Sequence, residues 1–229
     1  MSRFLNFNVK QKALFVAVSI SILALVSLNV SYIVAGIFIS PVWLSVVTSN
    51  LLITLCIAFF CRKRLWNVIT KHPLRLSGFL PGLFILLGSG VIALFTRIFF
   101  QDLTPRFFSA FSLAALLSLT LVPVMEEVMF RFFLTRVIGS YSSPILAAYL
   151  SMIVFAAAHS LPVFQLSDIA LISVPLGPLM MGGICEWLFF RYKNLVYPIF
   201  FHASANSTVF IFSLIDKRWL EWLKLLYLN

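Results

Sequence analysis

Two adjacent glutamates and an arginine lie in the middle of a long apolar segment. Glu126, Glu127 and Arg131 belong to a stretch of about residues 107–137 that is otherwise mostly apolar. A charged side chain at the centre of a bilayer costs ~2.5–3.5 kcal/mol on insertion scales, so these three residues are candidates for function. Glu127 and Arg131 are spaced i and i+4, the favoured order for an ion pair on a helix. Glu126 is turned about 100° from Glu127, and we expect the two carboxylates to face different spots.

Two of the three histidines also lie inside apolar segments. His159 follows Phe155 at i+4, and Asn206 follows His202 at i+4, so each pair shares one face of a helix. The third histidine, His72, lies in a basic loop, where we expect it at the surface without a function.

The depths of these residues can be compared through the turn near Ser142. In antiparallel helices with a rise of 1.5 Å per residue, Glu126 and His159 lie about 22 and 25 Å from that turn. His202 lies roughly 13 Å into its own helix by the same rise, which fits if the helix of Glu126 extends beyond the membrane. We therefore expect one acid and two imidazoles to converge.

A carboxylate with imidazoles can activate a water molecule for hydrolysis. We expect Glu126 to act as general base while His159 holds or polarises the water. Hydrolysis of a peptide bond also needs donors aimed at the developing oxyanion, which His202 and Asn206 can supply. The ion pair on the helix of Glu126 would fix that helix and the local electric field.

The polar residues form three motifs in order along the chain. They are EExxxR at Glu126, Glu127 and Arg131, FxxxH at Phe155 and His159, and HxxxN at His202 and Asn206. In this order they resemble the CPBP (Abi) family of intramembrane proteases, which includes the CAAX-type prenyl endopeptidases. The resemblance covers about residues 105–212. It implies that the first glutamate activates water, the first histidine assists, and the late histidine and asparagine line the oxyanion site. The candidate catalytic residues are therefore Glu126, Glu127, Arg131, His159, His202 and Asn206.

A bound metal is the main open question about this chemistry. Glu126, His159 and His202 can in principle hold zinc with an open position for water. No HExxH motif is present, and the amide of Asn206 is a poor zinc ligand. We favour a metal-free glutamate mechanism without a cofactor.

The elements that carry these motifs predict an all-α, polytopic transmembrane helix bundle. The chain has 229 residues, of which 62% are hydrophobic and only 10% charged, against about 25% charged in a soluble domain. Its mean hydropathy is +1.05. An interfacial amphipathic helix is expected at the C-terminus. The expected spans are about 13–39, 42–61, 78–99, 107–137, 145–161, 169–190 and 195–215.

Charge and span order predict the organisation of the chain. We divide it into an N-terminal three-span region (1–104), a catalytic intramembrane core (105–215) and an amphipathic tail (216–229). The formal net charge is +10, and the basic residues cluster in short loops on the side of the N-terminus. The positive-inside rule then makes the N-terminus of this integral membrane protein cytoplasmic. The expected partners are the lipid bilayer and a peptide or protein substrate, and no nucleic acid.

Three functions fit these observations. The favoured one is an endopeptidase that cleaves a membrane-associated or lipidated peptide. The alternative is a non-catalytic membrane protein for bacteriocin self-immunity or peptide export. A third is a transporter that uses Glu126 and His159 as a proton relay. One further residue carries a weaker expectation: Glu186 is placed near the cytoplasmic end of its span, where it can extend to the membrane surface or meet Arg191.

Overall fold

The computed structural model describes residues 42–99, 113–141, 143–160 and 170–213, and these ranges are helical. Within them there is no strand, so the expectation of an all-α fold is confirmed. Two 3-10 helices, η2 (Leu76–Gly78) and η4 (Ile138–Tyr141), and one π-helix, η3 (Val128–Val137), join the α-helices. The α-helices of the described ranges are α2 (Val42–Phe60), α3 (Arg62–Thr70), α4 (Leu80–Phe99), α5 (Leu113–Glu127), α6 (Pro144–Ser160), α7 (Ala170–Tyr192) and α8 (Val196–Ser213).

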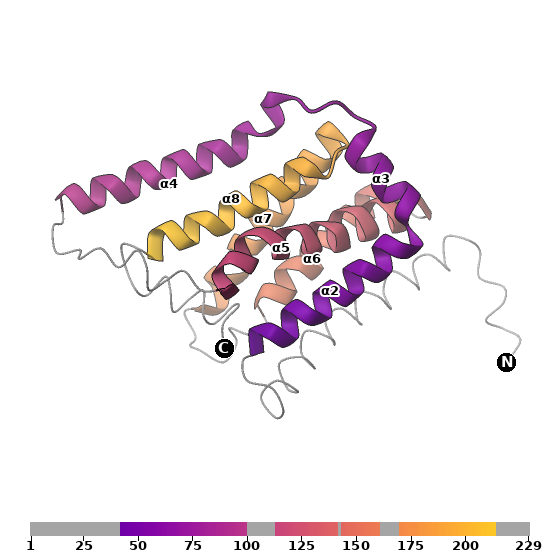
Figure 1. Cartoon of the computed structure of the whole chain (residues 1–229), viewed down its shortest axis with the longest axis horizontal. Helices are drawn as coiled ribbons and strands as arrows, with labels where there is room; N and C mark the ends of the chain where they lie inside the picture. Colours follow the sequence, from indigo (N-terminus) through magenta and orange to yellow (C-terminus); the bar gives the residue numbers. More distant parts are fainter. Residues whose placement is uncertain (1–41, 100–112, 142, 161–169, 214–229) are drawn as a thin grey trace, which may run out of the picture.

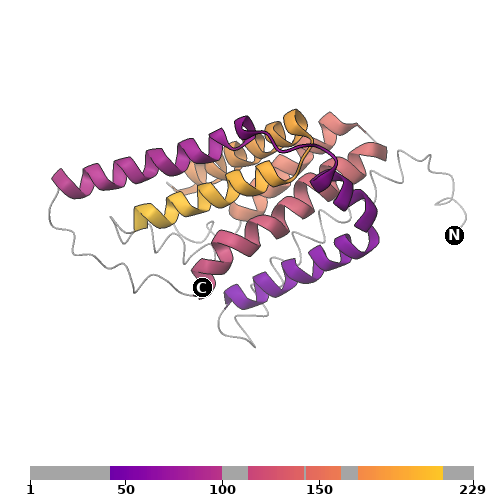
Figure 2. The same ribbon diagram turned by 45° about the horizontal axis from the view of Figure 1, so that its top comes forward.

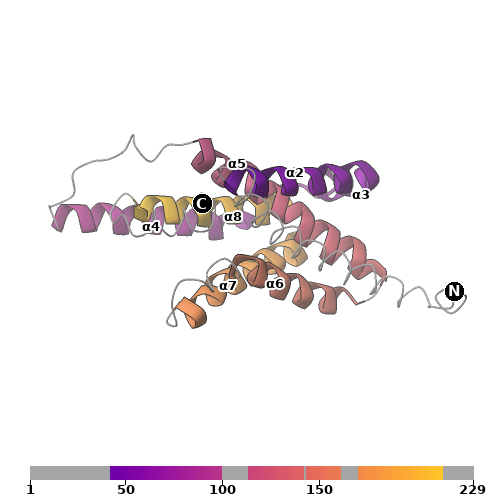
Figure 3. The ribbon, with the colours of Figure 1, turned by 90° about the horizontal axis from the view of Figure 1, so that it is seen from below.

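Helix α8 lies at the centre of the arrangement. It packs against α4, α5 and α7, while α6 packs against α7 and η3. Figure 1 shows α8 beside α4, and Figure 2 shows the same neighbourhood after a turn of 45°. Seen from below, α6 and α7 lie on one side of α8, and α2 and α3 lie on the other (Figure 3). The motif-bearing helices α5, α6 and α8 can therefore direct side chains to a shared interior.

The described helices begin and end within a few residues of the expected spans, apart from the first. The expected span 13–39 and the tail 216–229 lie outside the described residues. Among the residues that are described, no helix combines the length and the apolarity required to cross a membrane. The number of spans and the division into three regions stay predictions.

The basic segment after α2 is more ordered than expected. Most of it forms α3 instead of a loop. Leu65, Val68 and Ile69 recur at helical spacing and pack against the core, leaving the charged residues on the other face. This amphipathic pattern explains the helix, and it was overlooked because the charges dominate the segment.

The long helix of the glutamate pair changes its winding at the pair itself. The α-helical part ends at Glu127, and the π-helix η3 continues directly to Val137. Segments of π-helix are rare and occur often at functional sites. The side chains of η3 that are fully buried, Arg131 and Phe132, face the interior of the bundle.

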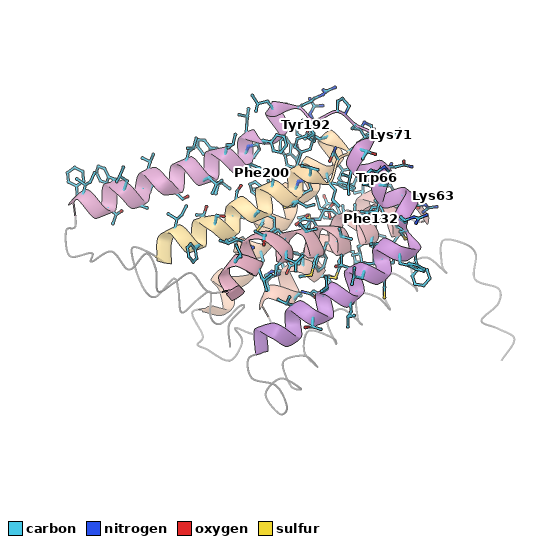
Figure 4. All side chains as sticks on the ribbon, viewed as in Figure 1. Lys63, Trp66, Lys71, Phe132, Tyr192 and Phe200 are labelled. Carbon is cyan, nitrogen blue, oxygen red and sulfur yellow. The ribbon has the colours of Figure 1, made fainter. Side chains whose placement is uncertain are left out.

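The close contact between α4 and α8 depends on a small residue. A Cβ atom added at Gly82 would lie 2.8 Å from Cδ1 of Phe200 and 2.9 Å from Oγ of Ser204. A larger side chain would push the two helices apart, since small residues are what allow close helix approach. Figure 4 shows Phe200 between α4 and α8.

Candidate active site

The carboxylate of Glu126 faces both motif histidines. Its Oε2 atom lies 3.5 Å from Nε2 of His159 and 3.6 Å from Nε2 of His202. The three residues come from α5, α6 and α8, and Glu126 is buried. The expected convergence of one acid and two imidazoles is present, and the catalytic roles of these residues stay predictions.

His202 contacts both members of the glutamate pair. Its Nδ1 atom lies 2.8 Å from Oε1 of Glu127, on the side of the ring away from the atom that faces Glu126. The two carboxylates therefore face different atoms, as expected, with Glu127 paired to Arg131 and Glu126 directed at the histidine Nε2 atoms. The sequence did not reveal that a single ring bridges the two neighbouring acids, because the two nitrogens of an imidazole point in different directions.

The expected ion pair between Glu127 and Arg131 is confirmed. Nε of Arg131 lies 3.1 Å from Oε2 of Glu127, and both side chains are fully buried. The guanidinium also donates from Nη2 to the carbonyl oxygen of Gly182 on α7, at 3.2 Å. Arg131 thus ties the glutamate pair of α5 to α7 as well as to its own helix.

Phe155 is a structural centre that the sequence did not reveal. Its ring is fully buried and lies 4.3 Å from the ring of His159 and 5.7 Å from that of His202, between ring centroids. The guanidinium carbon of Arg131 lies 4.7 Å from the same ring, within cation–π range. The phenylalanine of FxxxH therefore packs against both imidazoles.

Glu186 belongs to the same buried network, whereas the sequence predicted that it would reach the membrane surface or meet Arg191. Its Oε1 atom accepts a hydrogen bond from Oγ1 of Thr135 at 2.7 Å and lies 3.8 Å from Nε of Arg131. Arg191 is exposed. Residues five apart are turned about 140° from each other on an α-helix, so the expected contact was geometrically unfavourable. An acid inside an apolar helix was the signal for this buried role.

Asn206 lies one helical turn beyond His202 on α8 and is buried. The turn of the helix places both residues on the same side of α8. The structure thus puts the last of the six candidate residues next to the histidine of its motif.

Several polar atoms at the centre lack a hydrogen-bond partner within the described protein atoms. They include Oε2 of Glu126 and Nε2 of His202, the two atoms that face each other at 3.6 Å. Buried polar groups normally have a partner, and each exception calls for an explanation. Space between a carboxylate oxygen and two imidazole nitrogens is suited to a water molecule or a shared proton.

Within the described ranges, no group of three His, Cys, Asp or Glu side chains is recognised as placed to hold a metal ion. The zinc alternative at Glu126, His159 and His202 stays a prediction, and we derive no step through a metal.

One comparison with known proteins gives a match. A family model described as type II CAAX prenyl endopeptidase, Rce1-like, matches residues 107–208. This range contains all six candidate residues. Neither the curated proteins nor the solved structures include a significant match to the chain.

Proposed function

We propose, from the match of residues 107–208 to the Rce1-like family of type II CAAX prenyl endopeptidases, that the protein hydrolyses a peptide bond with a water molecule activated by Glu126. The observation that carries the proposal is the approach of both histidine Nε2 atoms to one oxygen of Glu126. The protein is then a glutamic endopeptidase in which His159, His202 and Asn206 assist.

The partners of the two rings indicate which nitrogen carries a proton. Nδ1 of His159 lies 2.9 Å from the carbonyl oxygen of Phe155, which can only accept, so Nδ1 must donate. Nδ1 of His202 faces Glu127, and an ionised carboxylate also only accepts. In the neutral rings both Nε2 atoms are then acceptors. Three acceptors around one point favour a bound donor, and a water molecule placed there can donate to two of them.

The reaction proceeds by transfer of a proton from this water to Glu126. The water oxygen forms a bond to the carbonyl carbon of the substrate, and the carbonyl oxygen becomes the oxyanion. Glu126 then returns the proton to the leaving amine as the C–N bond breaks. Each proton taken up by the carboxylate is released in the second step, so the enzyme is unchanged.

Stabilisation of the oxyanion is assigned first to Asn206. Its amide N–H groups are donors in every protonation state. Nε2 of His202 becomes a donor only when the ring carries a second proton. Removal of one oxyanion donor lowers turnover by about 10²–10³ in enzymes of known mechanism.

We place the protein in a membrane, with the N-terminus cytoplasmic. Large apolar side chains are exposed along α2, α4 and α6, an arrangement that marks contact with lipid or with a partner. Phe59, Phe60 and Phe84 are 79%, 80% and 80% exposed. The apolar composition of the whole chain supports the same location.

The substrate class follows from this location and from the family. A prenyl endopeptidase acts on a peptide that carries a lipid, and such a peptide enters from the membrane. We propose a lipidated or membrane-associated peptide, cleaved in or beside the cytoplasmic half of the bilayer.

Comparison of the wild type with Glu126→Gln in native membranes tests the function. The variant keeps the size of the side chain but cannot take up the proton, and turnover should fall about 10²–10⁴-fold. Proteomics of the two strains should show one precursor that stays uncleaved. Ser204→Ala is the control, since Ser204 is buried on α8 and bonds its own helix through the carbonyl of Phe200.

Full cleavage by Glu126→Gln would refute the mechanism. If both Glu126→Gln and His202→Ala kept the biological phenotype, the alternative of a non-catalytic immunity or export protein would replace the protease.

A further inference from the structure

A cavity with a basic lining lies at the end of the bundle near α3. Its volume is about 560 Å³, and its lining residues include no Asp or Glu. Three segments that are distant in sequence contribute basic side chains to it: α3 with the turn that follows, η3, and the turn between α7 and α8. The basic lining residues are Arg64, Lys71, His72, Arg136 and Lys193.

The walls of this cavity are held together by a buried asparagine. Nδ2 of Asn194 donates to the carbonyl oxygens of Ile69 at 2.9 Å and His72 at 3.2 Å. Its Oδ1 accepts from the backbone N–H of Val196 at 2.9 Å and caps α8. Asn194 is fully buried, so the end of α3 is fixed against the turn between α7 and α8.

Lys193 stands in this turn with a φ of 53°. A lysine in the left-handed region is uncommon, and here it carries a cation at the edge of the cavity. The acids of the described ranges, Glu126, Glu127 and Glu186, are buried in the active site and are not among the lining residues. Among the described residues, the lining of the cavity is therefore basic, and it offers hydrogen-bond donors that suit an anion.

The surroundings indicate that this anion is carried by an amphiphile. A neighbouring cavity of about 730 Å³ shares Arg64 with the first and is lined by Phe59 and Phe60, which project their rings to the outside. Trp66 on α3 is 65% exposed. Figure 4 shows Lys63, Trp66 and Lys71 along α3 at this end of the molecule. A basic recess next to exposed aromatic rings suits a charged head and an apolar chain.

We propose that the basic cavity binds the phosphate headgroup of an anionic phospholipid, whose acyl chains lie along Phe59, Phe60 and Trp66. Basic pockets between helices on the cytoplasmic side of a membrane recognise such headgroups. The inference rests on the membrane location in the proposed function, and it is independent of the catalytic step. It also makes use of the predicted orientation, which puts these three basic segments on the cytoplasmic side.

The cavity adjoins the active site through one residue. Thr135 lines the cavity and donates its hydroxyl to Glu186, which lies beside Arg131. A bound headgroup is thus one side chain away from the buried charge network.

Retention of lipid by the purified full-length protein tests the proposal. In detergent, the protein is titrated with phosphatidylglycerol or with phosphatidylcholine of the same chains, and bound lipid is counted by native mass spectrometry. The anionic lipid should be retained preferentially. Lys71→Gln combined with Arg136→Gln should weaken binding of the anionic lipid roughly 30-fold. This estimate takes about fivefold for each basic residue near an anionic headgroup.

Arg75→Gln combined with Arg191→Gln is the matched control, because these two arginines are exposed but do not line the cavity. This pair should leave retention unchanged. The proposal would be overturned if both double variants lost the anionic lipid equally. It would also be overturned if the wild type retained the two lipids equally. Displacement of the lipid by millimolar inorganic phosphate would instead indicate a site for free anions. Binding of an acidic peptide that the cavity variant abolishes, with lipid retention unchanged, would assign the cavity to that peptide.

The same measurement on Glu126→Gln separates this proposal from the catalytic one. Lipid retention should equal that of the wild type even though proteolysis is lost. If the wild type cleaves its substrate but retains the two lipids equally, the lipid site is refuted and the catalytic proposal is not.

Discussion

His202 lies between the two consecutive carboxylates, with Nδ1 2.8 Å from Oε1 of Glu127 and Nε2 3.6 Å from Oε2 of Glu126. One imidazole of α8 thus connects a glutamate paired with Arg131 to the glutamate that we assign as the base. We therefore expect the pair Glu127–Arg131 to act on the chemistry through this ring, with distinct tasks for the two adjacent acids.

The connection through His202 can be tested with a double-mutant cycle. Glu127→Gln keeps an acceptor for Nδ1 of His202 but removes the negative charge. A hydrogen bond to a charged group contributes ~1.5–3 kcal/mol, so turnover should fall about 10- to 100-fold. His202→Ala should lower turnover about 10²–10⁴-fold. Because residues that act as a unit are not additive, the double variant should be no worse than His202→Ala. Additive losses in the cleavage assay would show that the two residues act separately.

Phe155 should matter for activity more than for stability. Phe155→Leu keeps an apolar side chain of similar volume, and we expect a loss of stability below about 1.5 kcal/mol. It removes the ring that packs on both imidazoles, so turnover per folded molecule should fall about tenfold, the equivalent of ~1.4 kcal/mol.

Phe130→Leu is the matched control for this change. The ring of Phe130 packs edge-on against Phe155 at 5.2 Å between centroids, and no ring contact joins it to either histidine among the described residues. Its thermal stability should shift as in Phe155→Leu, while turnover stays near that of the wild type. An equal loss of turnover in both variants would assign Phe155 to packing only.

Thr135 and Glu186 should position Arg131. Thr135→Val has nearly the same shape but lacks the hydroxyl that bonds Glu186, and an unsatisfied buried group costs about 1–3 kcal/mol. We expect a lower midpoint of thermal unfolding and reduced turnover. Thr135→Ser keeps the hydroxyl and should restore both. Failure of serine to restore turnover would show that the methyl group, and not the hydrogen bond, is required.

Removal of metal should leave proteolysis unchanged. The proposed chemistry needs only Glu126 and a water molecule, so dialysis against a strong chelator should not lower turnover. Elemental analysis of the purified protein should find much less than one zinc ion per chain. Activity that disappears on chelation and returns with zinc would replace the metal-free mechanism with one in which Glu126, His159 and His202 hold the ion.

Part of the site could be predicted from local spacing. The ion pair of Glu127 with Arg131 follows from positions i and i+4 on one helix, and the structure contains it. The helix boundaries followed from apolar runs closed by proline or basic turns. The expected approach of Glu126 to His159 required only that α5 and α6 are antiparallel around a short turn.

The errors concern contacts between elements distant in sequence. Glu186 was expected at the membrane surface or beside Arg191, whereas it bonds Thr135, 51 positions away. The unforeseen bridge through His202 joins this ring to Glu127, 75 positions away, and to the adjacent Glu126. Neither contact has a signature in local periodicity, because each depends on how two helices are rotated against each other.

By itself, the sequence determined which residues had to be buried together and on which helix faces they stand. Helical periodicity is set by hydrogen bonds within one segment, so such faces can be read from spacing. Only the tertiary structure decided that Phe155 contacts two histidines, that Arg131 also meets α7, and that three basic segments line one cavity. Those features arise from the packing of side chains between helices, and packing depends on the shape and rotation of every neighbour at once.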